Sequence, residues 1–410
     1  MPQTRGAAKT AVKDLHDARS CWCDSTHRTV PTSELMRDET CEVLVVGAGI
    51  TGALTALTLA DAGHDVMIVD RREPGTGSTI ASTAMIQFEI DEPLTRLAKR
   101  IGPAKAARVY KRSYKAVRDL KAIIRKHDLR SDWVDRPALY LAGDDMGHRA
   151  LEDEAHARGK IGLPSRYLDG AELRDTYGFD RTGAILSKGA AELDPIRTCI
   201  ASLKAAKGLG ARLFAPVNVT KAAHDGQAIR VTTKDGPIMT CRNLVMATGY
   251  EASPAIPKDS FDIISSWAIA TKPVSPVRLW RDRCLVWEAS DPYLYMRTTE
   301  DNRILVGGED AAATAPSKRQ AAIATKSQKL LDKAKELTGL SELEIDYAWA
   351  GAFAENPKGL PVFRPIEGIP GAFAILGCGG NGITFSVIGA QVIRGGITGK
   401  RDPDASLFLG

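Results

Sequence analysis

A glycine-rich turn near the start of the chain carries the most specific chemical pattern. A short apolar run leads into the segment GAGITG, which contains Gly47, Gly49 and Gly52, and a second apolar run ends on Asp70. Gly47 permits a tight turn after a strand, Gly49 lets the backbone approach a pyrophosphate, and Gly52 lets a helix pack closely on the strand. The helix N-terminus offers N–H groups to phosphate, and the acid accepts a hydrogen bond from a ribose hydroxyl. The pattern therefore predicts a βαβ unit that binds FAD or NAD, and the acid disfavours NADP.

A loop rich in hydroxyl groups follows this unit. Arg71 comes directly after Asp70 and is a further candidate cofactor contact, and a turn with Pro and Gly then leads into Ser78, Thr79, Ser82 and Thr83. A loop that leaves the second strand of such a unit passes the cofactor, so these hydroxyls are candidates for bonding phosphate or ribityl oxygens. The alternative is an ordinary turn capped by Ser and Thr.

Two later strand ends point to the same cofactor. The segment LVMATG places Thr248 and Gly249 after a buried strand, and such small residues allow close approach of a ligand. The segment GCGGNGIT over 377–384 follows another apolar run and precedes a helix. That helix directs its N–H groups toward something anionic or electron-rich.

Candidate substrate contacts come from two alternating segments. Tyr295 and Arg297 share one face of a predicted strand, and an arginine there suits a substrate carboxylate. An outward-facing arginine is the alternative. Gln87 and Glu89 alternate in the same way after the hydroxyl-rich loop, and a glutamate there suits a cationic amine such as a polyamine. No residue is assigned as catalytic.

The composition indicates a globular protein of two or three domains. The 410 residues are 44% hydrophobic and 26% charged, with a net charge of +5 that does not indicate nucleic acid. No run of 18 apolar residues predicts a membrane span, and no secretory signal is evident. Seven cysteines without metal spacing favour free thiols in a reducing compartment, so we expect a cytoplasmic protein without a metal site.

The elements that must position these residues are divided among several segments. Residues 1–40 form a polar arm on the surface, partly disordered. We expect a discontinuous Rossmann-like cofactor domain and an α+β substrate domain with an antiparallel sheet. Asp91 is expected to cap a helix. The cofactor domain comprises 41–127 with 190–255 and 346–410, and the substrate domain comprises 128–189 with 256–345.

With these motifs, residues 41 to 400 resemble the FAD-dependent oxidoreductases of the D-amino acid oxidase and glycine/sarcosine oxidase superfamily. The resemblance rests on VVGAGITGALTALTLADAGHDVMIVD, GSTIASTAMIQFEID, LVMATGY and ILGCGGNGITFS. It implies a non-covalent FAD, with the first turn on its ADP half. The further cofactor contacts that it implies are Val219 at the adenine and, at the flavin, Gly379, Gly380, Asn381, Gly382, Ile383 and Thr384.

The sequence departs from that family at two positions, and the first departure puts the substrate of the sarcosine oxidase-like members in doubt. Thr384 stands where sarcosine oxidase-like members carry a lysine for the substrate carboxylate, and Lys358 replaces the usual Asp of Asp-Gly-Leu-Pro. No histidine follows His224.

Three functions remain open. The resemblance implies hydride transfer from the α-carbon of a small amine or amino acid to flavin N5. A 2-hydroxy-acid dehydrogenase on the same scaffold would need a base. The third is a flavin-binding subunit without its own turnover, docking through the basic helix at 104–127, although a charged helix face is usually only solvated. A redox partner or an oligomer is possible.

Overall fold

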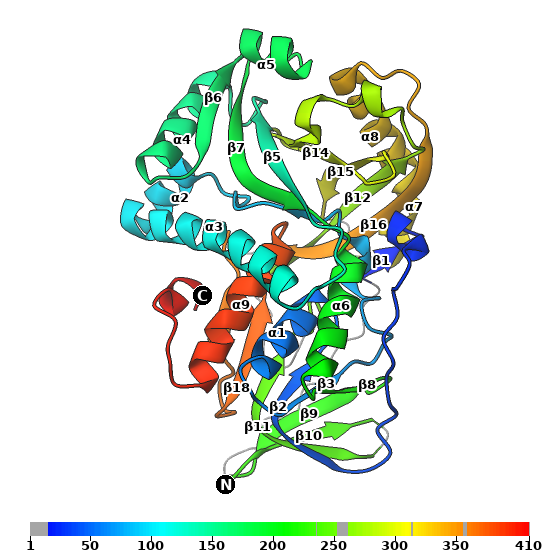
Figure 1. Ribbon diagram of the computed structural model, residues 1–410, viewed down its shortest axis with the longest axis vertical. Coiled ribbons are helices and arrows are strands. Elements are labelled where there is room, and N and C mark those ends of the chain that lie inside the picture. The colour runs from blue at the N-terminus through cyan, green and yellow to red at the C-terminus, as the bar shows by residue number, and fades with distance from the viewer. Residues whose placement is uncertain (1–14, 235, 252–260, 313–314, 356–358, 410) are drawn as a thin grey trace.

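The computed structural model describes residues 15–234, 236–251, 261–312, 315–355 and 359–409. Two sheets dominate it, an eight-stranded sheet in the lower part of Figure 1 and a ten-stranded sheet in the upper part. Helices cover both. The predicted α/β class, with a Rossmann-like part and a largely antiparallel second sheet, is observed.

The eight-stranded sheet has a parallel centre. Its order is β17 (Val362–Pro365), β18 (Ala372–Leu376), β11 (Ile238–Met246), β2 (Glu39–Val46), β3 (Val66–Val69) and β8 (Arg212–Phe214), with β10 (Ile229–Thr233) and β9 (Val219–His224) attached through β11. The pairs from β18 to β8 are parallel. Such strands are covered on both faces, which explains why they are continuous apolar runs in the sequence.

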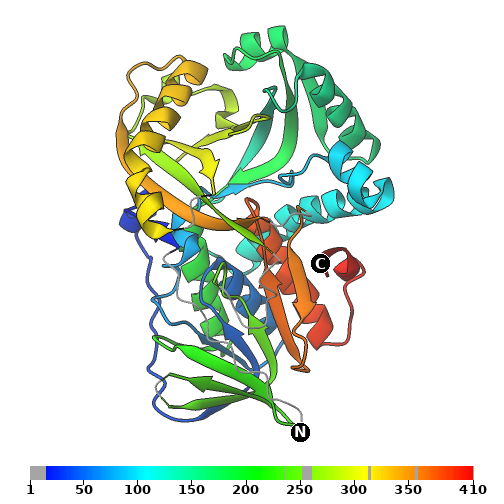
Figure 2. The same ribbon diagram turned by 180° about the vertical axis from the view of Figure 1, so that it is seen from behind.

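Helices cover one face of this sheet and a β-ribbon lies beyond the other. α1 (Ile50–Ala60) lies between α6 (Pro195–Gly208) and α9 (Gly382–Ile397), in front of the strands in Figure 1. From behind, β9 and β10 lie in front (Figure 2). The carboxyl ends of β2, β3 and β11 therefore meet the N-terminus of α1 at one edge.

The ten-stranded sheet is antiparallel apart from one pair, β13 with β5. Its order is β1 (His16–Asp17), β16 (Ile345–Glu355), β12 (Asp262–Thr271), β15 (Ile304–Ala311), β14 (Leu294–Thr298), β13 (Leu285–Glu288), β5 (Val134–Leu141), β7 (Gly183–Glu192) and β4 (Met85–Ile86), with β6 (Ser165–Asp169) on β7. It packs against α8 (Ile323–Thr338), α4 (His148–Lys160) and α5 (Gly170–Tyr177), and α7 (Pro316–Ala321) lies beside β1.

The predicted domain boundaries remain predictions, and one strand lies in a different sheet from the one expected. β16 pairs along its length with β12. Residues 346–355, which were assigned to the cofactor domain, thus belong to the ten-stranded sheet. The alternating residues of this strand suit a pleated sheet with two unequal faces.

The described part of the N-terminal arm lies along the surface and is anchored at a few buried residues. Trp22 is buried, and its indole Nε1 donates to Ser82 O at 2.7 Å. The Ser20 hydroxyl donates to Ile80 O at 2.7 Å, and β1 extends the ten-stranded sheet through β16. Most of this part is exposed, as expected of a surface arm, while Trp22 and Val30 join the main core and anchor the arm.

The helix after residue 91 is capped from a distance. α2 (Leu94–Ile101) begins after Pro93, and the Leu94 and Thr95 amides both donate to the Glu154 carboxylate at 2.8 Å. The expectation that Asp91 caps this helix was therefore wrong. A buried glutamate of α4 performs this role, and its pKa is lowered, since Arg158 and these hydrogen bonds outweigh burial.

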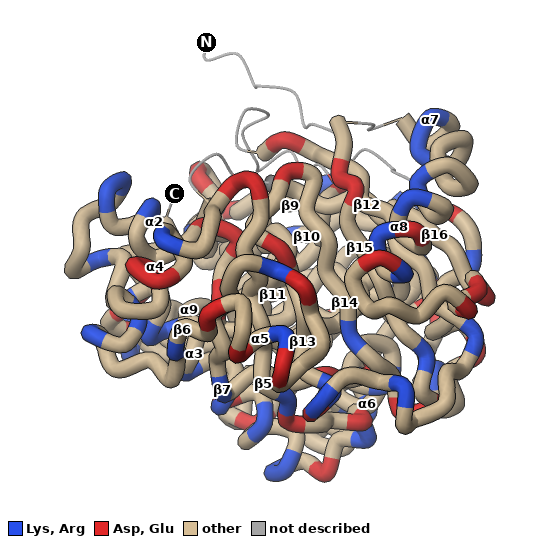
Figure 3. Tube along the Cα trace, turned by 90° about the horizontal axis from the view of Figure 1, so that it is seen from above, with Lys and Arg blue, Asp and Glu red and all other residues tan. Residues whose placement is uncertain are grey.

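The basic helix α3 (Pro103–Lys126) packs against α9. Five of its basic side chains are in ion pairs, namely Arg108, Arg112, Lys115, Lys121 and Lys126. Seen from above, basic and acidic segments are interspersed over the molecule (Figure 3). Within the described chain, no helix is long and apolar enough to cross a membrane.

Candidate cofactor and substrate site

One cavity runs from the carboxyl edge of the parallel strands to the ten-stranded sheet. It is lined by residues from the glycine turn, the hydroxyl-rich loop, β12, β14, β16 and the C-terminal glycine segment. The predicted cofactor contacts that line it are Gly47, Gly49, Asp70, Arg71, Ser78, Thr79, Ser82, Thr83, Val219, Thr248, Gly249, Gly379, Gly380, Gly382 and Ile383. Gln87 and Tyr295 line it among the predicted substrate contacts.

The glycine turn has room for no side chain at two positions. Gly47 has a φ of +112°, and a Cβ there would lie 2.3 Å from Ala247 O. A Cβ at Gly52 would lie 1.7 Å from Gly47 O. Gly52 does not line the cavity, so its role here is to let α1 pack on the turn, as the sequence pattern requires.

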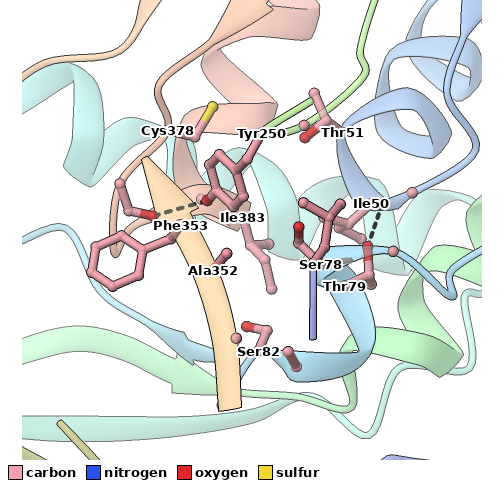
Figure 4. Close-up of a pocket in the computed structure, with 18 of the residues that line it drawn as sticks. Ile50, Thr51, Ser78, Thr79, Ser82, Tyr250, Ala352, Phe353, Cys378 and Ile383 are labelled. Carbon is pink, nitrogen blue, oxygen red and sulfur yellow. Dashed lines mark hydrogen bonds between the residues drawn. The ribbon is translucent and has the colours of Figure 1, made fainter. Parts of the chain in front are cut away.

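The N-terminus of α1 and the hydroxyl-rich loop face each other across the cavity wall. The Ile50 amide donates to Thr79 Oγ1 at 3.0 Å, and Gly49, the N-cap residue, offers no side chain (Figure 4). The Ser78 hydroxyl is buried without a hydrogen-bond partner in the described structure. A helix N-terminus, a bare glycine and an unused hydroxyl donor together fit a pyrophosphate.

Asp70 lies at the same end of the cavity. Its two carboxylate oxygens accept from the Ala48 amide at 2.6 Å and from the Arg72 amide at 2.8 Å. Burial raises its pKa, and these amides oppose the rise. A carboxylate has about four acceptor positions, so hydrogen bonds from ribose hydroxyls are still possible.

Arg71 and Arg72 form ion pairs at this end of the cavity with Glu251, a carboxylate that sequence analysis missed. Glu251 lines the cavity and accepts from Arg71 and, at 2.6 Å, from Arg72. It follows Thr248-Gly249 by two residues, so its place after that strand end was the available signal. The Arg71 side chain therefore lines the cavity while its charge is met by a protein carboxylate.

The C-terminal glycine segment forms the opposite wall. The Tyr250 hydroxyl donates to Gly379 O at 3.4 Å, and the Gly380 amide donates to the Asp91 carboxylate at 3.1 Å (Figure 4 shows the first contact). Gly377 and Gly379 have φ values of +61° and +54°, which favour glycine. The backbone can thus approach a flat ligand closely along this wall.

Two predicted cofactor contacts, Asn381 and Thr384, lie outside the cavity lining. Asn381 Nδ2 donates to Glu89 O at 2.6 Å, and the Thr384 hydroxyl donates to Gln87 O at 3.0 Å. Their donors face protein carbonyls, because the segment 87–89 crosses directly over the start of α9. These side chains fix the backbone that presents Gln87 to the cavity.

Arg297 does not lie where the sequence pattern suggested. Its guanidinium donates to Thr83 O at 2.6 Å, Leu193 O at 2.9 Å and Thr298 O at 3.1 Å. Its side chain is 2% exposed and lies 3.7 Å from the Glu192 carboxylate. The alternation along β14 was a sound basis for Tyr295, but Arg297 is committed to backbone carbonyls rather than to a substrate carboxylate.

Glu89 is likewise buried away from the cavity. Its carboxylate lies 3.6 Å from Arg158, a fully buried side chain that also pairs with Glu154 at 2.8 Å. Its predicted role of recognising a cationic amine is not supported at this position. The alternation of 87 and 89 fails because the segment bends between β4 and α2 and does not continue as a strand.

The substrate end of the cavity is lined by aromatic and polar side chains from separate strands. The rings of Tyr293 and Tyr295 lie 5.7 Å apart, and Trp287 of β13 pairs in register with Tyr295. Burial raises the pKa of Tyr295 to about 12, so its hydroxyl stays protonated at neutral pH. The indole Nε1 of Trp287 and the amide Nε2 of Gln87 are buried without partners in the described structure.

Two carboxylates at this end were missed as site residues. Asp91 lines the cavity and has an exposed side chain, and burial of the surrounding region raises its pKa. Asp310 lies outside the cavity lining, and burial raises its pKa to about 6, against the effect of hydrogen bonds from Ser266 and Tyr293. The sequence offered little signal for either, because no characteristic spacing links the two residues.

Comparison with known proteins identifies the family of the chain. Residues 42–394 match the family described as FAD dependent oxidoreductase. The chain belongs to this family. It is therefore an enzyme that uses FAD, which agrees with the fit of the glycine turn, Ser78 and Asp70 to a dinucleotide. Within the described residues, no group of three or more His, Cys, Asp or Glu side chains is arranged to hold a metal ion.

Three similar proteins illustrate the range of this family. The probable oxidoreductase OrdL of Haemophilus influenzae is 24% identical over 96% of this chain and 90% of its own length. Gamma-glutamylputrescine oxidoreductase of Escherichia coli K12 is 26% identical over 91% of this chain and 87% of its own. The crystal structure of glycine oxidase from Geobacillus kaustophilus matches with a TM-score of 0.73 at 20% identity, over 89% and 96% of the two chains. That structural likeness supports the shared fold.

Proposed function

We propose that this enzyme oxidises the C–N bond of a small amine or amino acid. The observation that carries the proposal is the continuous cavity that connects the glycine turn to Tyr293 and Tyr295. Two of the similar proteins are named for gamma-glutamylputrescine and for glycine. When bound, FAD supplies a hydride acceptor at N5, which turns the amine into an imine that water then hydrolyses.

The residues of the chain act by binding, orienting and excluding water. The amine must react in its neutral form, and a largely apolar, enclosed wall favours that form. Tyr295 stays protonated, and its hydroxyl, the Gln87 amide and the Trp287 indole offer hydrogen-bond donors without negative charge. Positioning of this kind supplies much of the rate when no strong base is needed.

A non-covalent FAD is part of the proposal. Cys378 lines the cavity beside the C-terminal glycine segment, and burial raises the pKa of its thiol to about 12. At neutral pH it is a neutral thiol and a poor nucleophile. This argues against a thioether link to the flavin.

A 2-hydroxy-acid dehydrogenase is the second candidate, because Asp91 presents a carboxylate base to the cavity. A hydroxy acid also brings a carboxylate that needs a cation. Arg71 and Arg72 line the cavity near Asp70, where Glu251 binds both, and Arg297 is held by carbonyls. The amine is therefore the better fit. A subunit without turnover is less favoured, because the cavity extends beyond the glycine turn to the tyrosines and five basic side chains of α3 are in ion pairs.

Turnover with an artificial electron acceptor tests this proposal without knowledge of the natural one. The purified enzyme is mixed with a redox dye and a panel of amines, amino acids and 2-hydroxy acids, and carbonyl product and released amine are quantified. We expect dye reduction with amines, in equal amounts with the carbonyl product. Dye reduction only with hydroxy acids would support the second candidate.

A further inference from the structure

The substrate end of the cavity differs in charge from what a carboxylated substrate needs. Its described lining includes the carboxylate of Asp91 and the aromatic side chains Tyr293, Tyr295 and Trp287. The described lysines and arginines that line the cavity are Arg71 and Arg72, both paired with Glu251 near Asp70. A substrate carboxylate would therefore meet like charge at this end.

Asp91 is placed to contact a ligand rather than to support the fold. Its carboxylate accepts from the Gly380 amide at 3.1 Å, while the side chain remains exposed to the cavity. A Cβ on Gly380 would lie 2.9 Å from Asp91 Oδ1, so the glycine allows this close approach. The glycine segment thereby directs the carboxylate along the cavity wall.

Asp310 reinforces the negative charge from behind the tyrosines. Both of its carboxylate oxygens are buried, and the hydroxyls of Ser266 and Tyr293 lower its pKa against the larger effect of burial. Asp310 follows Glu309, which forms ion pairs with the nearby Lys326 and Lys333. The charge of Asp91 also raises the pKa of Asp310, so the two carboxylates lie within electrostatic reach of each other. These neutral donors do not fully offset the cost of burying the charge, and a nearby cation would lower that cost.

The aromatic wall suits the same kind of partner. Tyr293 and Tyr295 lie 5.7 Å apart, and a ring face attracts an alkylammonium group within about 6 Å. Trp287 stacks on Tyr140 with centroids 3.8 Å apart, which leaves its ring rigidly held at the cavity. Such a wall binds methylene groups and a positive charge together.

Building on the proposed function, we propose that the substrate is a diamine or polyamine, whose second, non-reacting ammonium group binds beside Asp91, Tyr293 and Tyr295, with the charge of Asp310 behind the tyrosines. The reacting nitrogen stays neutral, because the carboxylates hold the remote cation. Amino acids are poor substrates, since their carboxylate meets negative charge. The class of amine is inferred from the negative charge and the aromatic side chains at the substrate end.

Three compounds of equal chain length test this inference. We would measure kcat/KM with a redox dye, and binding by calorimetry, for 1,4-diaminobutane, 1-aminobutane and 4-aminobutanoate. We expect the diamine to exceed the monoamine by about 10- to 100-fold in kcat/KM, as expected for a charge-assisted hydrogen bond, and the amino acid to be the poorest. The binding constants should follow the same order.

Substitution of the carboxylates locates the effect. Asp310→Asn and Asp91→Asn should each reduce the ratio of diamine to monoamine about tenfold or more in kcat/KM and in affinity. Asp153→Asn, on the exposed face of α4, is the matched control and should leave the ratio unchanged. Thermal unfolding of each variant, measured by scanning calorimetry beside the binding constants, separates loss of binding from loss of folding.

The outcomes distinguish this inference from the proposed function. If monoamines or amino acids are oxidised as well as the diamine, or if both Asn variants retain the wild-type ratio, this inference is overturned while amine oxidation stands. If no amine is oxidised and 2-hydroxy acids are, the proposed function itself is overturned.

Discussion

The two ends of the cavity are built in different ways. The cofactor end is centred on backbone, from the glycines and amides around Gly47, with Asp70 and Ser78 added by the segment that follows. The substrate end is made of side chains from β12, β13, β14 and the residues after β4, which are far apart in the sequence. The local sequence sets the geometry of a backbone site, whereas the geometry of a side-chain site depends on how distant strands pack together. Substitutions should therefore separate cofactor binding from substrate selection.

The largest expected effect is at the cofactor end. Gly52→Ala would place a Cβ 1.7 Å from Gly47 O, so α1 must move away from the turn. We expect a loss of about 3 kcal/mol or more in the free energy of unfolding, and purified protein without flavin. The flavin-to-protein absorbance ratio and a thermal melt measure both. Gly159→Ala, in α4 with no atom near its Cβ, is the control and should retain flavin and full stability.

Arg297→Met tests whether Arg297 binds a substrate carboxylate, as the sequence suggested, or stabilises the fold through backbone carbonyls, as the structure indicates. The buried guanidinium stabilises three carbonyls and the Glu192 carboxylate, so its removal should lower the free energy of unfolding by about 3 kcal/mol. If Arg297 instead clamped a substrate carboxylate, the variant would fold normally and lose affinity only for carboxylated substrates. Denaturant unfolding beside KM values for an amine and an amino acid separates these results.

The difference between a backbone site and a side-chain site also decides which residues could be predicted from the sequence. Gly47, Gly49, Gly52 and Asp70 could be predicted because their spacing encodes a backbone geometry that only one local structure satisfies. Arg297 could not, because alternation along a strand gives the face of a side chain but not the carbonyls that surround it.

Tertiary contacts also explain where the structure differs from the sequence-based predictions for Asp91, the N-terminal arm and β16. Asp91 precedes a helix, as a cap would, yet Glu154 from α4 supplies the cap and leaves Asp91 at the cavity. The polar arm contains Trp22, whose burial under the hydroxyl-rich loop no local pattern predicts. The fold class was recoverable because buried apolar strands and βαβ spacing are local, whereas the sheet membership of β16 is not.

Asp310→Asn probes the cost of charge at the substrate end. The pKa of this carboxyl is raised from 3.8 to about 6, so above pH 6 the charged form destabilises the folded state, by about 2 to 3 kcal/mol. As the pH falls through 6 the folded protein takes up a proton, and the penalty disappears below 3.8. We expect the variant to be more stable than wild type at pH 8 and equal to it near pH 4. Equal stability at pH 8 would argue against a buried charge here.

Gly307→Ala disturbs the substrate end alone. A Cβ there would lie 2.3 Å from the Tyr295 ring, which faces Gly307 in register across the strands. We expect the ring to shift and kcat/KM to fall about tenfold, a typical cost of misplacing a contact, with flavin content unchanged. A variant that loses flavin would show that the two ends are not separable.

The smallest effect is expected on α3. Lys115 is 62% exposed and pairs with Asp119 one turn along the helix. Lys115→Ala should change the free energy of unfolding by no more than about 0.5 kcal/mol and leave turnover with the dye unaltered. A strong loss of turnover with a natural electron acceptor, but not with the dye, would instead revive a docking role for this helix.

The most direct test of the central claim is the absorbance spectrum of the purified protein, followed without oxygen while an amine is added. The account predicts flavin bands that bleach on addition of 1,4-diaminobutane, because the amine at the substrate end reduces the FAD held at the glycine turn. Protein that remains colourless after incubation with FAD, or flavin bands that no amine bleaches, would contradict it.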